Sequence, residues 1–410
     1  MSQKAQLHIW RMVIDLPQWE GYVALWRPNS EGECLLALGA EEIVGGDDLA
    51  RLDEIQKSCD WWFGYLSYDL KNKIEKLSSR HPNPMEFEGF SFFKPKVVLR
   101  LNADEYLVEK DVTDGFWRSA LVDTEPFIPK PQKIYWKPDQ SREDYIDGVN
   151  ALKQHIQLGD IYEVNYCTSF SCEKQLSENF TLFEHINERT DAPFSAYLKY
   201  GRHEVMCGSP ERYLKKEGNR LSSYPIKGTI KRSVDPVEDN VLKEKLRNDQ
   251  KEQAENVMIV DLVRNDLSRI ALKNSVKVDE LFGVYSFKTV HHMISTVSCE
   301  IDENTTLSEV INATFPMGSM TGAPKIMAME LADRYETCGR GLYSGSVGVV
   351  FPNGDFDFNV VIRTMLYDSE KHLIRCNVGG AITSLCNAEK EYDECLLKAS
   401  ALLSIGKEFI

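Results

Sequence analysis

Three consecutive strand-like segments near the C-terminal end constrain the fold of this chain more than any other feature. Residues 346–351, 356–367 and 372–382 each carry the apolar pattern expected of a strand. Between the first two, Pro352–Asp355 reads Pro-Asn-Gly-Asp, which is typical of a tight turn. Strands joined by so short a turn pair antiparallel. The sequence therefore predicts an antiparallel sheet and not the regular alternation of a doubly wound fold.

Mixed helical and strand patterns in the rest of the chain predict an α+β protein with large antiparallel sheets. Residues 97–108 are expected to form a strand, and residues 142–158 a helix. Residues 125–138 contain four prolines and are interpreted as a connection. We place a boundary there, with residues 1–135 as an N-terminal region of the same β-rich fold and residues 140–410 as the principal domain.

Composition and charge narrow the class of protein. The 410 residues are 42% hydrophobic, which is enough to bury a large core. The N-terminus lacks an apolar signal core, and no run of eighteen apolar residues occurs, so we expect a soluble protein of the cytoplasm with no membrane contact. The net charge of −15 argues against nucleic-acid binding. Ten cysteines without a Cys-x-x-Cys pair or a zinc spacing favour reduced thiols.

Two acidic helical segments are the first candidates for chemistry. Glu252 and Glu255 stand three residues apart and share a helix face, and Glu255 falls within the apolar arc of Met258, Ile259 and Leu262. A carboxylate directed at a core needs a partner. This face is therefore a candidate for binding a cation, although salt bridges at the rim of the core would explain it equally well.

The second acidic segment repeats the pattern near the C-terminus. Glu391 and Glu394 are again three apart, and we place Glu394 and Lys398 on the arc of Leu397, Ala401, Leu402 and Ile405. Four carboxylates from two helices could hold Mg²⁺, which takes a few carboxylate oxygens and leaves positions for water and substrate. The alternative is a surface ion pair between Glu394 and Lys398.

Glycine-rich turns supply candidate anion sites. Residues 315–325 run into a predicted helix at 326–335, and such a turn can present backbone N–H groups to an anion. Gly379 and Gly380 end a predicted strand, where the backbone can approach a carboxylate closely, and Arg363 offers a bidentate guanidinium. Each of these features is equally compatible with a purely structural role.

Taken together, the motifs identify the chain as similar to the chorismate-binding enzymes, from about residue 142 to the C-terminus. Upstream, residues 63–69 resemble the aminating members of that family. The segments that carry the resemblance, in the family's order, are residues 159–165, 208–211, 225–229, 258–266, 292–295, 318–325, 340–343 and 362–364.

The resemblance implies an anthranilate synthase component I-like fold, with antiparallel sheets in a sandwich-like core flanked by helices. It implies that Glu211 protonates the departing C4 hydroxyl of chorismate and that His292 is an active-site histidine. Mg²⁺ would bind, directly or through water, to Glu252, Glu255, Glu391 and Glu394. The implied substrate-binding residues are Gly228, Thr229, Ser319, Tyr343, Arg363, Gly379, Gly380, Ala381 and Lys398.

Lys227 distinguishes among the activities of the family, because lysine there is typical of aminodeoxychorismate synthases whereas anthranilate synthases carry alanine. The resemblance implies a covalent lysine adduct at C2 and amination at C4, giving 4-amino-4-deoxychorismate for para-aminobenzoate and folate synthesis. The nucleophile must be a neutral amine, so burial and a nearby Mg²⁺ would have to lower the lysine pKa from about 10.4. Glu163 departs from the glutamine usual in aminating members, and its effect is left open.

The expected partners follow from the same reasoning. The chain shows no glutaminase nucleophile, so ammonia would come from a separate glutamine amidotransferase subunit. A separate lyase would act on the product, which keeps its enolpyruvyl group. The alternatives are anthranilate synthase component I and a chorismate-binding homologue without catalysis.

Overall fold

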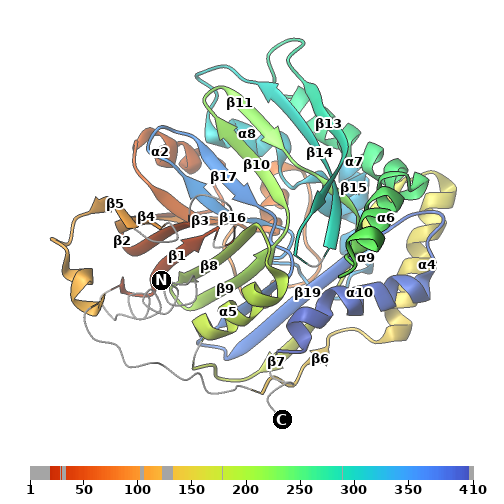
Figure 1. The fold of residues 1–410 in the computed structure, drawn as a ribbon, viewed down its shortest axis with the longest axis horizontal. Coiled ribbons are helices and arrows are strands. Elements are labelled where there is room, and N and C mark those ends of the chain that lie inside the picture. Colours follow the sequence, from red (N-terminus) through yellow and green to blue (C-terminus); the bar gives the residue numbers. More distant parts are fainter. Residues whose placement is uncertain are drawn as a thin grey trace.

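A computed structural model describes residues 19–27, 29, 34–101, 106–121, 133–177, 179–288 and 290–405. Antiparallel pairing joins the strands within these residues, and Figure 1 shows them at the centre of the molecule with helices gathered around them. The strands are β1 (Tyr22–Trp26), β2 (Cys34–Gly46), β3 (Trp62–Leu66), β4 (Phe90–Leu101), β5 (Tyr106–Asp111), β6 (Lys137–Pro138), β7 (Glu163–Glu173), β8 (Phe194–Tyr200), β9 (His203–Ser209), β10 (Arg212–Glu217), β11 (Arg220–Ser223), β12 (Ile226–Lys231), β13 (Lys277–Ser286), β14 (Val290–Glu300), β15 (Gly322–Ala323), β16 (Ser346–Val350), β17 (Phe356–Asn359), β18 (Thr364–Asp368) and β19 (Leu373–Ile382).

Helices cover the outside of this β-structure, with α4, α6, α9 and α10 on one side of the molecule (Figure 1). Their ends have ordinary caps: Ser141 accepts a hydrogen bond from a backbone N–H at the start of α4, and Gly159 ends it at φ +86°. The helices are α2 (Leu52–Lys57), α3 (Lys71–Ile74), α4 (Arg142–Leu158), α5 (Asn179–Thr190), α6 (Pro236–Arg247), α7 (Gln250–Ser268), α8 (Leu307–Thr314), α9 (Lys325–Tyr335) and α10 (Ala388–Leu403). None of the helices in the described ranges is long and apolar enough to cross a membrane.

Strands in the centre of the β-structure, such as β2, are buried on both faces, as in a sandwich. Along β2, Leu36 and Leu38 join one apolar cluster, whereas Leu35 and Ala37 join another. Alternate residues of a strand point to opposite faces, so the second cluster fills the space between layers and the first lies under helices. This confirms the α+β fold with large antiparallel sheets.

The N-terminal strands are built into the same β-structure as the later ones. Strand β1 pairs with β8, and β3 pairs with β16 along its whole length. Most of the proline-rich connection lies outside the described residues, since 122–132 are not described. Its end at Lys137–Pro138 forms β6 and pairs with β7.

Two segments that the sequence predicts as single strands are each divided into two strands in the structure. Residues 97–108 span the end of β4 and the start of β5, which pair antiparallel with Leu101 opposite Tyr106. Residues 356–367 divide into β17, which pairs with β10 and β16, and β18, which pairs with β9 and β19. The chain changes pairing partners between them, and an apolar pattern does not reveal such a crossing. The 346–351 and 372–382 strands and the 142–158 helix are confirmed.

Candidate active site

Lys227 lies on β12 at a break in the ladder with β14. Ile226 pairs with Ile294 and Thr229 with His292, so the register shifts across Lys227 and Gly228. Gly228 adopts φ +90°, and an added Cβ would come within 3.2 Å of the Glu252 carboxylate on α7. A bulge of this kind changes the direction of a side chain, and here it lets the backbone approach the acidic helix.

The Lys227 ammonium is buried and ion-paired. Its Nζ donates a hydrogen bond to Oε1 of Glu163 at 2.6 Å, and the two side chains are 12% and 2% exposed. Burial lowers the lysine pKa, but Glu163, and then Glu255 and Glu211, favour the charged form and leave the pKa raised. The carboxylate of Glu163 is buried against the amine, so burial alone does not lower the pKa of Lys227. The expectation that burial would favour the neutral amine is therefore not met in the free protein.

Glu211 follows β9 and accepts a hydrogen bond from the Ser319 hydroxyl at 2.6 Å. Burial raises the pKa of this carboxyl to about 7, although Ser319, Lys227 and Arg363 favour its charged form. An acid with a pKa near neutrality can donate a proton to a leaving group at physiological pH. The structure therefore places Glu211 in hydrogen-bond contact with Ser319 and within electrostatic reach of Lys227.

His292 on β14 is buried and shares a hydrogen bond of 2.8 Å with the Thr229 hydroxyl through Nδ1. Burial, with Arg363 nearby, lowers its pKa to about 3. The imidazole is therefore neutral at physiological pH. It is suited to orienting a group or accepting a proton, and not to acting as a cation.

Arg363 and Tyr343 occupy different surroundings. Arg363 lies between β17 and β18 with φ +50°, and its carbonyl accepts a hydrogen bond from the N–H of Gly208. Its guanidinium interacts with Glu211. Tyr343 is buried, with its ring against the core cluster that contains Cys167, and burial raises its pKa well above the usual range. Arg363 thus belongs with the Lys227 group, while no described contact joins Tyr343 to it.

The acidic face of α7 is half-buried. Glu255 lies at the margin of the apolar face, with Ile259 buried and Met258 and Leu262 partly so. Burial, followed by repulsion from Glu255, raises the pKa of Glu252. The predicted inward direction of Glu255 is thus borne out only in part, since the fully buried stripe of α7 begins at Asn256.

The predicted arc of α10 is confirmed at Leu402 and Ile405, which are buried, but not at its start. Leu397 is 72% exposed, and Glu394 and Lys398 form an exposed ion pair of 2.8 Å. Glu391 is the buried carboxylate, on the face of Cys395 and Ala399. The prediction was wrong because it gave Leu397 a core position, whereas packing against β19 selects the neighbouring face.

Two glycines of β19 allow the strand to approach α10. A Cβ on Gly380 would come within 3.3 Å of the Glu391 carboxylate, and Lys398 donates a hydrogen bond of 3.3 Å to the Gly379 carbonyl. Ala381, next along β19, pairs with Asn165 of β7. The backbone of residues 379–381 therefore lies between β7 and the acidic end of α10.

The glutamates of α7 and α10 act on one another electrostatically. Glu394 contributes to raising the pKa of Glu252, and both Glu394 and Glu255 contribute to raising that of Glu391. No three of them already form a metal-coordinating cluster among the described residues. Facing carboxylates whose charges repel one another suit a divalent cation held partly through water and substrate oxygens.

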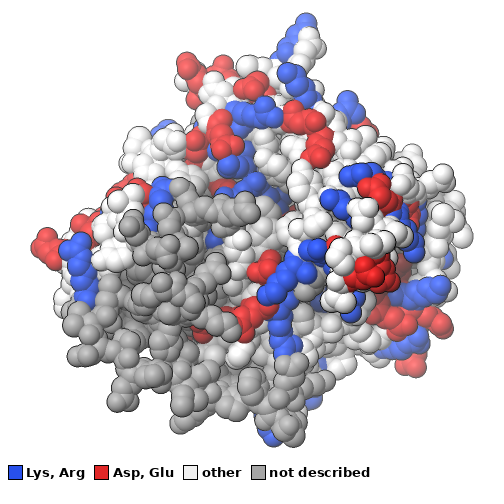
Figure 2. All heavy atoms as spheres, in the orientation of Figure 1, with Lys and Arg blue, Asp and Glu red and all other residues white. Residues whose placement is uncertain are grey.

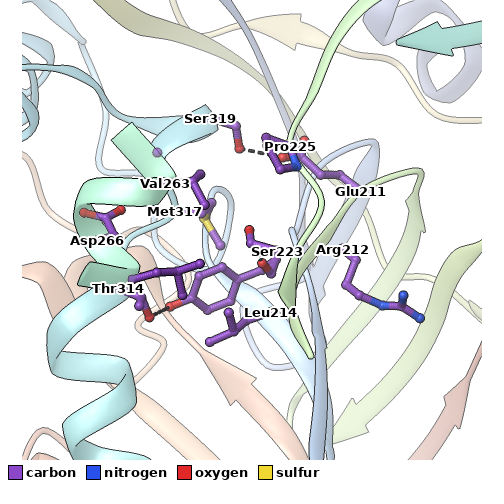
Figure 3. A pocket seen from close by; sticks show the side chains of 13 residues that line it. Glu211, Arg212, Leu214, Ser223, Pro225, Val263, Asp266, Thr314, Met317 and Ser319 are labelled. Atoms are coloured by element: carbon purple, nitrogen blue, oxygen red, sulfur yellow. Dashed lines mark hydrogen bonds between the residues drawn. The ribbon is translucent and has the colours of Figure 1, made fainter. Parts of the chain in front are cut away.

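A cavity beside Glu211 was not anticipated from the sequence. Figure 3 shows Glu211 and Ser319 on one side and Asp266 and Thr314 on another, with Thr314 hydrogen-bonded to Tyr213. Asp266 also pairs with Lys325 at 2.6 Å. The partners are 59 residues apart, and no local signal indicates the pairing.

Acidic and basic side chains are interspersed on the visible face of the molecule, so the net charge of −15 forms no single acidic field there (Figure 2). The charge that matters for the site is local. Lys227, Lys251, Arg363 and Lys398 lie among six carboxylates, which are those of Glu163, Glu211, Glu252, Glu255, Glu391 and Glu394. The carboxylates outnumber the basic groups, so this set favours a divalent cation.

The chain matches the model of a family described as chorismate binding enzyme over residues 33–404. It is 36% identical to aminodeoxychorismate synthase component 1 of Escherichia coli strain K12, covering 83% of this chain and 75% of that protein. It is also 36% identical to the chloroplastic aminodeoxychorismate synthase of Arabidopsis thaliana, covering 86% of this chain but only 41% of that protein.

Solved structures agree on the fold. Anthranilate synthase component I from Streptococcus pneumoniae superimposes with a TM-score of 0.77 at 22% identity, covering 93% of this chain and 90% of that one. The menaquinone-specific isochorismate synthase of Escherichia coli gives 0.76 at 17% identity, covering 95% and 91%. At such identities the likeness concerns architecture alone.

Proposed function

The chain belongs to the family of chorismate-binding enzymes, and on that premise we propose that it aminates chorismate at C4 to give 4-amino-4-deoxychorismate. The observation that carries the proposal is the buried Lys227, which lies within electrostatic reach of the acid Glu211. The names of the relatives in Escherichia coli and Arabidopsis thaliana support amination. The product would serve para-aminobenzoate and folate synthesis.

The proposed chemistry divides between a nucleophile and an acid. The neutral amine of Lys227 attacks C2 of the ring while the C4 hydroxyl departs, protonated by Glu211. Ammonia then attacks C4, and the C2–N bond breaks to release the lysine. Neutral His292, fixed by Thr229, would orient the leaving hydroxyl.

Substrate binding would use the remaining predicted residues. Arg363 and the backbone of residues 379–381 would hold the enolpyruvyl carboxylate. Tyr343 would join them from the core cluster that contains Cys167, the neighbour of Gly379. Glu252, Glu255, Glu391 and Glu394 would hold Mg²⁺, directly or through water. When bound, Mg²⁺ would neutralise and orient the ring carboxylate of chorismate.

Ammonia in this proposal comes from a separate glutamine amidotransferase subunit in the cytoplasm, and a separate lyase consumes the product. The component 1 name of the Escherichia coli relative supports a partner component. The Arabidopsis relative is more than twice as long as the matched region, so its whole activity is not assigned to this chain.

Product analysis tests the proposal. The purified chain is incubated with chorismate, Mg²⁺ and ammonium, and the products are separated and weighed by mass spectrometry. We expect aminodeoxychorismate without release of pyruvate. Anthranilate together with pyruvate would assign the chain to anthranilate synthase instead, and chorismate binding without turnover would indicate a non-catalytic homologue.

A further inference from the structure

Glu163 is a buried residue on a paired strand next to Lys227. It begins β7, pairs with Ala323 of β15, and is followed by Val164, which pairs with both β15 and β19. Its side chain is 2% exposed. A carboxylate fixed on a strand between two neighbours keeps its position relative to the lysine during a reaction.

The two oxygens of this carboxylate differ. Oε1 accepts the 2.6 Å hydrogen bond from Lys227, whereas Oε2 is buried and has no hydrogen-bond partner in the described structure. A buried carboxylate with one partner is poorly stabilised as an anion. Moving one proton along the existing hydrogen bond converts two buried charges into two neutral groups, with no change in net charge.

The other carboxylates near Lys227 have different roles in the proposed reaction. Glu211, between β9 and β10, must keep its proton for the leaving group. Glu255 on α7 and Glu394 on α10 interact with the lysine only at longer range, and both are proposed to face the cation. Within the described part of the chain, Glu163 is the residue that accepts a hydrogen bond from the Lys227 ammonium.

We propose that Glu163 takes the proton of Lys227, so that the nucleophile is stored as an ion pair and released by proton transfer within that pair. This inference rests on the proposed function and adds a catalytic role at a position where aminating relatives usually carry glutamine. Storage as an ammonium also keeps a buried amine from reacting with other electrophiles.

The proton balance closes over one cycle. Glu163 accepts the proton, and the neutral amine attacks C2 as Glu211 gives its proton to the departing hydroxyl, forming water. Ammonia forms the bond to C4 while the C2–N bond breaks and leaves a neutral lysine. The new ammonium at C4 returns a proton to Glu211, and Glu163 returns its proton to Lys227.

The first test needs no substrate. Cyanate carbamylates only neutral amines, and its reaction at Lys227 can be followed by peptide mass spectrometry at pH 8. In Glu163→Gln the buried lysine loses its strongest charge partner, so a larger fraction of the amine is neutral, and we expect carbamylation about tenfold faster than in wild type. Equal rates would overturn the proposal.

Asp266→Asn supplies the matched control, because it makes the same carboxylate-to-amide change in another buried lysine pair of 2.6 Å. It should leave carbamylation of Lys227 at the wild-type rate. Acceleration at Lys227 in this variant would mean that general loosening of the fold, and not the loss of Glu163, exposes the amine, and would also overturn the proposal.

The second test uses the wild-type protein and single-turnover formation of the lysine adduct with chorismate and saturating Mg²⁺. Between pH 6 and 7, transfer within the pair predicts no rise in the rate, because the pair keeps one proton throughout, and the loss of the Glu211 proton near pH 7 lowers the rate by about twofold at most. Loss of the lysine proton to solvent predicts about a tenfold rise per pH unit, which leaves a net rise of about fivefold after the effect of Glu211, and would overturn the proposal. Glu163→Asp should retain the wild-type pH profile at a lower rate. Absence of any adduct would overturn the proposed function. The cyanate experiment would still show whether Glu163 keeps Lys227 protonated, because it needs no substrate.

Discussion

Two buried lysine–carboxylate pairs of equal length have opposite characters. Lys227 lies 2.6 Å from Glu163, and Lys325 lies 2.6 Å from Asp266. Lys325 also donates to the carbonyls of Pro316 at 2.8 Å and Thr314 at 3.4 Å, so its ammonium has three acceptors. Lys227 has Glu163 as its one hydrogen-bond acceptor in the described ranges.

The pKa directions of the two lysines follow from their surroundings. Burial outweighs Asp266 and lowers the pKa of Lys325, while burial also raises that of Asp266 to about 6. Three carboxylates outweigh burial and raise the pKa of Lys227. A lysine with all its hydrogens engaged fixes a loop, here the one that carries Ser319 to Glu211. A lysine with free hydrogens can turn toward a substrate.

Replacing Lys227 tests this contrast most strongly. Lys227→Ala should reduce amination by on the order of 10³-fold or more, since it removes the nucleophile, with little change in the fold. Steady-state assay of aminodeoxychorismate and a thermal melt measure the two effects. Wild-type rates in this variant would rule out an obligatory covalent step.

The acid next to Lys227 gives the next largest effect. Glu211→Gln should lower kcat by about 10²–10⁴-fold. In the wild type, Glu211 with a pKa of about 7 carries its proton below that pH and loses it above, so kcat should fall as pH rises through about 7. A pH profile of kcat that stays level from pH 6 to 8.5 would remove Glu211 from the role of acid.

The second pair should influence stability more than chemistry. Asp266→Asn leaves a buried ammonium without its counter-ion and should reduce the free energy of unfolding by about 3–5 kcal/mol. Urea denaturation measures this change. A decrease of less than about 1 kcal/mol in the free energy of unfolding would show that the carbonyls of Pro316 and Thr314 are enough to stabilise the Lys325 ammonium. Asp266 would then have no special structural role, and the two lysine pairs would differ less than proposed.

The buried glutamate of α10 should set the cation requirement. Glu391→Gln should raise the Mg²⁺ concentration for half-maximal activity by about tenfold, because it removes a carboxylate oxygen from the proposed site. Glu389→Gln, a change at an exposed position two residues earlier on the same helix, is the control and should leave the Mg²⁺ dependence unaltered. Equal Mg²⁺ titrations for the two variants would exclude Glu391 as a ligand.

Local signals in the sequence predicted local structure well. The boundaries of α4 follow from Ser141 and Gly159, and the turn after β16 follows from Pro-Asn-Gly-Asp, with Gly354 at φ +80°. The division between β17 and β18 could not be predicted, because it depends on which strands lie alongside. On α10, the apolar Leu397 faces outward and the charged Glu391 faces inward, so hydrophobic periodicity indicated the wrong face.

The candidate site was predictable as a set of residues but not as a set of contacts. The motifs located Lys227, Glu211 and Ser319, and the structure brings these together. The Lys227–Glu163 pair joins β12 to β7, and its two residues are 64 apart in the sequence. The distance between their side chains depends on how the strands are arranged in the fold, which no local pattern in the sequence reveals. The sequence raised Glu163 as a departure from the family pattern and left its consequence open. In the structure, the Glu163 carboxylate accepts a hydrogen bond from Lys227.

The proposed reaction requires a covalent bond between Lys227 and the substrate. Peptide-resolved mass spectrometry detects this bond directly after the protein is mixed with chorismate and Mg²⁺ in the absence of ammonia. We expect that Lys227, and not Lys325, gains the mass of chorismate less one water, and that added ammonium discharges this adduct as aminodeoxychorismate. An unmodified Lys227 in protein that turns over promptly once ammonium is added would contradict this expectation.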